Sequence, residues 1–171
     1  MDDQKEHNRL IEALPAAVYV CNENGYITYY NRSAALLWGQ SPITGECQWY
    51  SLWKIYNSNG DLLPVDKCPV SIAKEERKQI ILEEIIVELR NGTCYYLLSS
   101  PQPLFDVNGN FIGVMDMLVD ITKRKQEQLK FREKIVKKNE ELLRQKELVE
   151  TMIDASVDII SVYDKNTRFI A

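Results

Sequence analysis

Four Asn-Gly pairs divide the first two thirds of this chain into short strand-like runs. The pairs begin at Asn24, Asn59, Asn91 and Asn108. Asn-Gly readily adopts the positive φ angles of tight hairpin turns, so such a pair between two strand-like runs predicts a hairpin. The strand-like runs that flank the first, third and fourth pairs are residues 17–22, 26–30, 81–90, 93–100 and 111–119. Five strands joined mainly by hairpins predict one antiparallel sheet.

Short helices are expected between these strands. A lead-in helix is expected within residues 1–14, and a second helix over residues 33–38, with Asn31 as its N-cap and Gly39 as its end. A third begins at Pro69, because proline suits the first turn of a helix. The order of strands and helices predicts an α+β fold, in which a five-stranded antiparallel sheet carries its helices on one face.

The pattern changes at Ile121, after which the chain contains neither glycine nor proline. A seam of residues spaced alternately three and four apart then follows, in the way of a coiled coil. Its members are Arg132, Ile135, Asn139, Leu142, Lys146, Val149 and Ile153. An asparagine at an a position, as Asn139 would be, tends to fix register and oligomeric state at a cost in stability. We expect a long helix over residues 123–153 that pairs in parallel with a second copy; the alternative is an amphipathic helix packed on its own domain.

Two segments of the chain resemble each other without a gap, residues 10–29 and residues 152–171. Their few identities include Ile11 with Ile153 and Asn24 with Asn166, and most other pairs are conservative. A repeated segment indicates an array of one module. The chain therefore divides into a lead-in at 1–14, a complete domain at 15–122, a connecting helix at 123–153 and the start of a second module at 154–171.

Composition and charge argue against several classes of function. Residues 1–120 carry 9 basic and 16 acidic side chains, a net charge of −7 that does not favour nucleic acid. Residues 121–150 carry 10 basic and 6 acidic side chains, but their signs alternate as on a solvated helix. No apolar run approaches the roughly 18 residues that cross a bilayer, and the polar N-terminus is not a secretory signal. We expect a cytoplasmic protein with no membrane segment.

The residues of common catalytic sites are missing from the sequence. The single histidine is His7, in the lead-in segment, whereas Ser/His/Asp and Cys/His catalysis need a histidine in the site. The glycine motifs that bind phosphates are also absent. The four cysteines are dispersed, without a C-x-x-C pair, so we expect reduced thiols and no metal site. The sequence predicts no enzyme activity within this chain.

Three segments of the chain resemble the PAS family. Residues 10–38 are similar to its opening, a lead-in helix, a hairpin and an N-x-x-A helix. Residues 53–73 resemble a subgroup with a W-K-x-Y strand and a C-P step before the last helix. Residues 108–123 resemble its closing PAC-like motif, in which Asp-Ile-Thr follows the last strand. The resemblance covers about residues 8–123, and the segment from Met152 resembles the start of a second PAS domain.

The resemblance implies a sensory role. PAS domains sense a ligand, cofactor or partner, and here the change would leave through Asp120, Ile121 and Thr122 into the following helix. The implied effector is a two-component histidine kinase, with a diguanylate cyclase or a transcription regulator as alternatives. Residues 121–153 contain no histidine, so kinase catalysis would lie outside this chain. Two other functions stay open, a small-molecule or flavin carrier that acts alone, and a ligand-free dimerising spacer.

The resemblance also limits the cofactors. Haem-binding members use an axial histidine, and photoactive flavin members use a cysteine in a motif that residues 45–49 do not match. Neither haem held by histidine nor a flavin bound covalently to cysteine is expected, and the cofactor is unknown. The tryptophans could stack on a ring or pack in the core, and the methionines could line a pocket or pack on the sheet. The candidate pocket residues are Trp38, Trp53, Cys68, Met115 and Met117.

Overall fold

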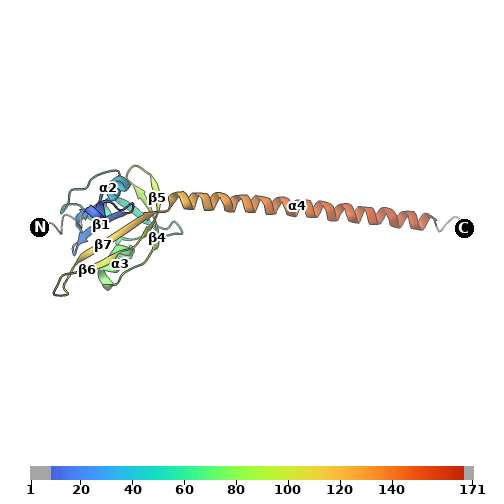
Figure 1. The fold of residues 1–171 in the computed structure, drawn as a ribbon. Helices are drawn as coiled ribbons and strands as arrows, with labels where there is room; N and C mark the ends of the chain where they lie inside the picture. Colours follow the sequence, from blue (N-terminus) through green and yellow to red (C-terminus); the bar gives the residue numbers. More distant parts are fainter. Residues whose placement is uncertain (1–8, 168–171) are drawn as a thin grey trace. The chain divides into compact units, whose positions relative to one another are not determined.

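The computed structural model describes residues 9–167, and the side chains of residues 9–155. Its contacts divide the chain into two units, which we call the sheet domain, ending at Lys125, and the helical unit, starting at Gln126 (Figure 1). Within the sheet domain, residues 9–12 are helical and belong to the predicted lead-in helix. The first eight residues of that prediction lie outside the described residues.

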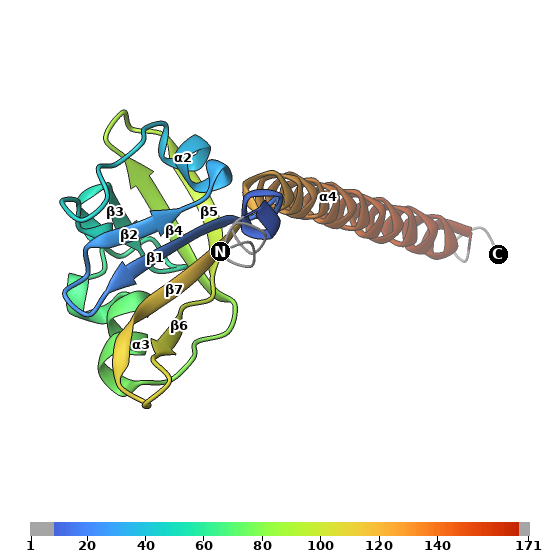
Figure 2. The ribbon, with the colours of Figure 1, turned by 60° about the vertical axis from the view of Figure 1, so that its left-hand side comes forward.

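Seven antiparallel strands form a single sheet. They are β1 (Ala17–Asn22), β2 (Ile27–Tyr30), β3 (Trp53–Tyr56), β4 (Glu83–Leu89), β5 (Cys94–Ser99), β6 (Gln102–Phe105) and β7 (Phe111–Asp120). Their order is β2-β1-β7-β5-β4-β3, and β6 pairs with β7. Figure 2 shows β2, β1 and β7 side by side. The predicted antiparallel α+β fold is confirmed.

Two of these strands lie outside the five strand-like runs. Strand β3 is the W-K-x-Y strand that the resemblance implies, and it pairs with β4 at one edge of the sheet. Strand β6 follows a break at Pro101 and pairs with the first half of β7, whereas β5 pairs with its last residues. A short run that contains Pro103 gives a weak strand signal, because proline has no N–H to donate to a ladder.

All four Asn-Gly pairs lie at turns between antiparallel partners. They connect β1 to β2, Tyr56 to Leu62, β4 to β5, and β6 to β7. Each of the four glycines has a positive φ, between 82° and 91°. The hairpins predicted at the first and third pairs are confirmed, whereas the strand before the fourth pair is β6 and not the predicted run at residues 93–100.

The helices of the sheet domain begin and end where their caps predict. Helix α2 (Arg32–Trp38) has Asn31 as its N-cap, which accepts a hydrogen bond from the Ala34 N–H, and Gly39 closes it in the left-handed conformation. Helix α3 (Pro69–Glu76) starts at its proline. Two 3-10 turns, η1 (Trp49–Ser51) and η2 (Val65–Lys67), lie between these helices.

Asn31 also joins the lead-in segment to α2. Its amide nitrogen donates to the carbonyl oxygens of Ile11, at 3.0 Å, and of Ala16, at 2.9 Å. Glu12 Oε2 accepts from the N–H of Arg32 at 2.9 Å. The start of the domain is therefore fixed to the first turn of α2 by hydrogen bonds.

The core lies between one face of the sheet and helices α2 and α3. It combines alternate residues of the strands with Ala34 and Trp38 of α2 and with Val70 and Ala73 of α3. Both helices share this cluster, so they cover the same face of the sheet. That face is called the inner face below, and the other the outer face.

Helix α4 (Thr122–Thr167) follows β7 directly. Every described side chain from Gln126 to Ala155 is exposed. The predicted helix over residues 123–153 is present and continues to Thr167. The assignment of residues 154–171 to a second module stays a prediction, and residues 168–171 lie outside the described part.

Candidate functional site

The junction between β7 and α4 is fastened to the sheet by hydrogen bonds. Asp120 Oδ1 accepts from the N–H of Thr122 at 2.8 Å, and so caps one of the free N–H groups at the start of the new helix from the residue before the N-cap position. The Thr122 hydroxyl oxygen accepts from the N–H of Tyr96 at 2.9 Å, and the Ile121 N–H donates to the carbonyl oxygen of Tyr96, also at 2.9 Å. Tyr96 of β5 therefore holds both residues that follow the last strand.

An ion pair adds a second attachment one turn further along. Lys125 Nζ lies 2.6 Å from Glu84 Oε1 of β4, and the two side chains are only 27% and 29% exposed. A partly buried pair at this distance is screened less by solvent than a surface pair. We call the set of Glu84, Tyr96, Asp120, Ile121, Thr122 and Lys125 the exit junction.

The sequence predicts only the contiguous half of the exit junction. Asp120, Ile121 and Thr122 stand together in the chain, whereas Tyr96 and Glu84 lie on other strands. Tyr96 and Glu84 reach the exit junction because strand pairing brings β5 beside the end of β7. The sequence contains no local signal for these contacts.

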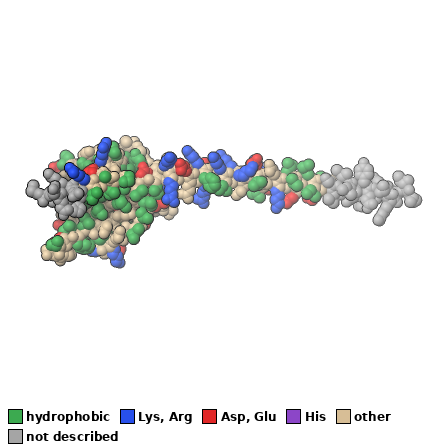
Figure 3. All heavy atoms as spheres, viewed as in Figure 1, with side chains coloured by type: hydrophobic (Ala, Val, Ile, Leu, Met, Phe, Trp, Pro, Cys, Tyr) green, Lys and Arg blue, Asp and Glu red, His purple; other side chains and the backbone are tan. Residues whose placement is uncertain are grey.

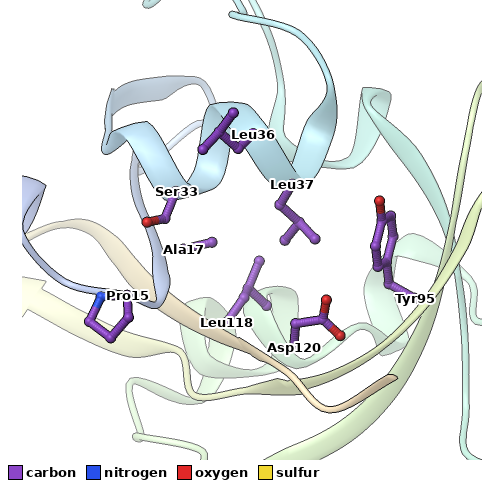
Figure 4. Close-up of a pocket in the computed structure, with 8 residues that line it drawn as sticks. All are labelled: Pro15, Ala17, Ser33, Leu36, Leu37, Tyr95, Leu118 and Asp120. Atoms are coloured by element: carbon purple, nitrogen blue, oxygen red, sulfur yellow. The ribbon is translucent and has the colours of Figure 1, made fainter. Parts of the chain in front are cut away.

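A hollow of about 330 Å³ opens beside the exit junction (Figure 4). It lies under α2 and reaches the end of β7. Its lining residues are Pro15, Ala17, Ser33, Leu36, Leu37, Tyr95, Leu118 and Asp120. Asp120 thus belongs both to the wall of this hollow and to the cap of α4, so a molecule in the hollow would touch the residue that starts the helix.

A buried carboxyl group lies further back on β7. Asp116 is 1% exposed and faces the inner side, where it accepts from Ser99 Oγ, from the Ser100 N–H at 2.9 Å and from the Tyr19 hydroxyl at 3.3 Å. Burial raises the pKa of Asp116 to about 7, against the hydrogen bonds, which lower it. Burial and the neighbouring Asp116 also raise the pKa of Tyr19 well above its usual value.

The two candidate tryptophans meet in the core. Trp38 and Trp53 are 4% and 7% exposed, and their ring centroids lie 5.8 Å apart in an edge-to-face arrangement. Tyr19 and Tyr30 pack against Trp38 in the same way, at 5.5 and 5.6 Å. Such pairs stabilise a core beyond the area they bury. The structure therefore gives these tryptophans a packing role, and neither of them lines the hollow beside the exit junction.

Cys68 is also a core residue. It is 2% exposed, and its thiol donates to the carbonyl oxygen of Pro64 at 3.4 Å. Although Cys68 precedes the first turn of α3, burial raises its pKa to about 11, so the thiol is protonated near neutral pH. This environment supports packing rather than redox chemistry.

Met115 and Met117 lie on the outer face, away from the tryptophans and Cys68. Side chains alternate along a strand, and Val114, Asp116 and Leu118 are the buried residues of this part of β7. The two methionines therefore lie on the opposite face of the sheet from Trp38, in a position that suits packing on the sheet. The sequence Met-Asp-Met suggests the opposite orientation, because an aspartate is rarely buried. Here the donors around Asp116 allow the carboxyl group to face inward.

The seam of α4 is exposed in the described structure. Ile135, Leu142, Val149 and Ile153 are 46–56% exposed, and Asn139 lies among them. In Figure 3, apolar side chains recur along α4 between charged ones. Apolar side chains at this spacing on an otherwise solvated helix are typical of a surface that pairs with another helix.

In the described residues, no three His, Cys, Asp or Glu side chains are grouped so as to hold a metal ion. No helix of residues 9–167 is long and apolar enough to span a membrane.

Comparison with known proteins identifies the fold. A sequence profile of the family described as "PAS fold" matches residues 11–126. The chain belongs to the PAS family. The sheet domain is therefore a PAS domain, as the sequence resemblance indicates. A comparison with curated proteins finds no significant match.

Solved PAS domains share this architecture at low sequence identity. A PAS domain from Colwellia psychrerythraea superposes with a TM-score of 0.55 at 21% identity, covering 71% of this chain and 99% of its own. The PAS domain of nitrogen regulation protein NR(II) from Vibrio parahaemolyticus gives 0.53 at 14% identity, with coverages of 67% and 97%. The PAS domain of BvgS from Bordetella pertussis gives 0.51 at 19% identity, with 77% and 96%. At these identities the likeness establishes the fold alone.

Proposed function

We propose that this chain is a cytoplasmic PAS sensory module that regulates a downstream effector through α4. The observation that carries the proposal is the exit junction, in which the last strand continues into a helix that two other strands also hold. A ligand or partner that shifts the sheet would move Tyr96 and Glu84, and with them the first turn of α4. The effect of such a shift is a change in the relative populations of two helix arrangements.

The module would act as a parallel homodimer through the seam of α4. In a parallel pair, Ile135, Leu142 and Val149 would each face their own copy, and Asn139 would face Asn139. The polar a positions make this pairing marginal, which suits a switch whose two states differ by a few kcal/mol.

The effector that we favour is a two-component histidine kinase, with a diguanylate cyclase or transcription regulator as alternatives. Neither the seam nor the exit junction contains a histidine that could accept a phosphoryl group. The chain itself would therefore transmit a signal rather than catalyse a reaction. A ligand that shifts the population of the active arrangement would be its input.

Disulfide formation between copies tests the pairing. In a background with Cys94→Ser, which removes the exposed cysteine, a Leu142→Cys variant should form a covalent dimer under mild oxidation. The matched control is Arg144→Cys, which helical spacing places about 200° away from position 142. Covalent dimers at equal rates in both variants, or in neither, would contradict a parallel seam.

The same assay tests whether a change in the PAS domain reaches α4, which we call the relay. Glu84→Gln removes the ion pair with Lys125, and Glu83→Gln changes the exposed neighbour as a control. We expect the first change to alter the rate of Leu142→Cys disulfide formation at least about twofold, since about 0.4 kcal/mol suffices for that, and the second to leave it unchanged. An identical rate in both variants would mean that α4 does not report on the PAS domain.

A further inference from the structure

The polar groups around the hollow beside the exit junction favour a ligand that donates hydrogen bonds. Ser33 Oγ donates its proton to the carbonyl oxygen of Leu14 at 2.9 Å, so only its lone pairs remain for a ligand. The carboxylate of Asp120 only accepts, and its bond to the Thr122 N–H uses Oδ1, which leaves Oδ2 for a ligand. The Tyr95 hydroxyl, which points away from Asp120 in Figure 4, can also accept.

The charged lining of the hollow is acidic. Asp120 is its only acidic residue, and among the described residues no lysine or arginine lines it. Lys125, the nearby base of the exit junction, is engaged with Glu84. Residues 1–125 carry 12 basic and 16 acidic side chains, a net charge of −4, so the field of the domain attracts cations.

The remaining wall is aliphatic. Five of its eight lining residues have apolar aliphatic side chains, namely Pro15, Ala17, Leu36, Leu37 and Leu118. A volume of about 330 Å³ is at the small end of the range for ligand sites. The hollow thus combines an apolar wall, one carboxylate and acceptor oxygens.

We propose that this hollow binds a small aliphatic primary amine, with its ammonium group on Asp120 and its hydrocarbon chain against Leu37 and Leu118. A primary ammonium group has three N–H donors and no acceptor, which matches the polar groups present. The proposal rests on the proposed function, because it names the class of ligand that the module senses. The bound cation would share Asp120 with the Thr122 N–H, and so would alter the cap of α4 directly.

Methyl NMR of the full chain with three matched probes tests this site. The probes are hexylammonium chloride, hexan-1-ol and sodium hexanoate at equal ionic strength. Hexylammonium should shift the methyl signals of Leu36, Leu37 and Leu118 saturably, with a Kd about fivefold lower than that of hexanol, as expected for one exposed ion pair of about 1 kcal/mol. Hexanoate should bind most weakly, because Asp120 repels it.

Two variants identify the groups responsible. Asp120→Asn keeps an acceptor for the Thr122 N–H but removes the charge, so it should abolish the preference for amine over alcohol. Leu36→Trp, at a position that is 71% exposed, should partly fill the hollow and weaken both probes without unfolding the domain. Circular dichroism checks the fold of each variant.

Several outcomes would overturn the inference. These are equal Kd values for the amine and the alcohol, tight binding of hexanoate, an undiminished amine preference in Asp120→Asn, or methyl shifts away from the hollow. Failure of the proposed relay from the PAS domain to α4 would give a different result from failure of amine binding. In that case hexylammonium would bind at the hollow but leave the methyl signals of Ile121 and Leu129 and the rate of Leu142→Cys disulfide formation unchanged.

Discussion

The PAS domain buries its apolar side chains in a core, whereas α4 leaves its apolar side chains exposed. The PAS domain encloses a core in which Tyr19, Ile27, Val87 and Leu97 are 0–1% exposed. From Gln126 to Ala155, every described side chain of α4 is exposed, leucines and isoleucines included. Isolated helices derive little stability from propensity alone, so an apolar stripe is normally covered by a partner.

Under the proposed function, this difference would separate stability from signalling. The PAS domain carries its own stability, whereas the state of α4 depends on what covers its seam. The exit junction is the covalent and hydrogen-bonded link between the two. A change in either unit can then be tested for its effect on the other.

The largest effect is expected from Gly113→Ala, which attacks the sheet itself. Gly113 has a φ of +152°, and a Cβ there would lie 2.0 Å from the carbonyl oxygen of Cys21 on β1. Because β1 and β7 would have to separate, we expect a loss of about 4 kcal/mol or more in the free energy of unfolding. Chemical denaturation followed by tryptophan fluorescence measures it.

Gly92→Ala is the control for backbone strain alone. Gly92 has a φ of +82°, with no atom within 4 Å of a built Cβ. It should lose only about 1 kcal/mol. Equal losses in the two variants would show that the contact between Gly113 and β1 is unimportant.

A second pair of variants compares the two units directly. Leu97→Ala removes a side chain that is fully buried, and should cost about 2–5 kcal/mol of PAS domain stability. Leu143→Ala removes one that is 60% exposed on α4, and should cost less than about 0.5 kcal/mol in the dilute monomer. A large loss in Leu143→Ala would instead support an α4 packed on its own domain.

The pH dependence of stability should reveal the buried carboxyl group. With its pKa raised to about 7, Asp116 stays protonated in the folded domain at pH 5, while in the unfolded chain it is ionised above about pH 4. The folded state then binds more protons between these values, so stability should fall as pH rises, by roughly 2 kcal/mol from pH 5 to pH 7. Above the folded pKa this contribution should no longer change.

Asp116→Asn and Asp106→Asn complete that experiment. The first removes the titrating group and should flatten the slope. The second removes an exposed carboxylate whose pKa is lowered by hydrogen bonds from Asn110, so it titrates below this window and the slope should remain. A slope that persists in Asp116→Asn would assign it to another group.

Asn139→Leu tests the helical unit. Replacing a polar residue at an a position should tighten the dimer about tenfold, or roughly 1.4 kcal/mol. Arg144→Leu adds the same side chain on another face of α4 and should change the dimer little. Sedimentation equilibrium measures both, and a tighter dimer in Arg144→Leu alone would place the seam elsewhere.

The smallest expected effect is that of salt on the dimer. Residues 122–138 carry eight basic and two acidic side chains, whereas residues 139–155 carry two basic and five acidic ones (Figure 3). A parallel pair places like charges together, so 0.5 M salt should tighten it about threefold relative to 0.05 M. Weakening by salt would indicate antiparallel pairing of the basic and acidic halves.

The sequence alone determined the local elements of this protein. The Asn-Gly hairpins, the Asn31 cap, the Gly39 stop and the helix start at Pro69 agree with the structure, because each depends on the φ preferences or hydrogen bonds of a few adjacent residues. The long helix after Ile121 was predictable from its regular three-and-four spacing and its lack of glycine and proline. The place of Asp120, Ile121 and Thr122 after the last strand followed from the resemblance to the PAS family.

Tertiary structure decided which side of each strand faces inward and which distant residues meet. Strand alternation alone could not tell that Asp116 points into the core and Met115 and Met117 away from it, since that depends on the donors that Ser99, Ser100 and Tyr19 supply. The contacts of Tyr96 and Glu84 with the start of α4 likewise arise from strand order. These are long-range contacts, fixed by packing and register, and no short stretch of sequence records them.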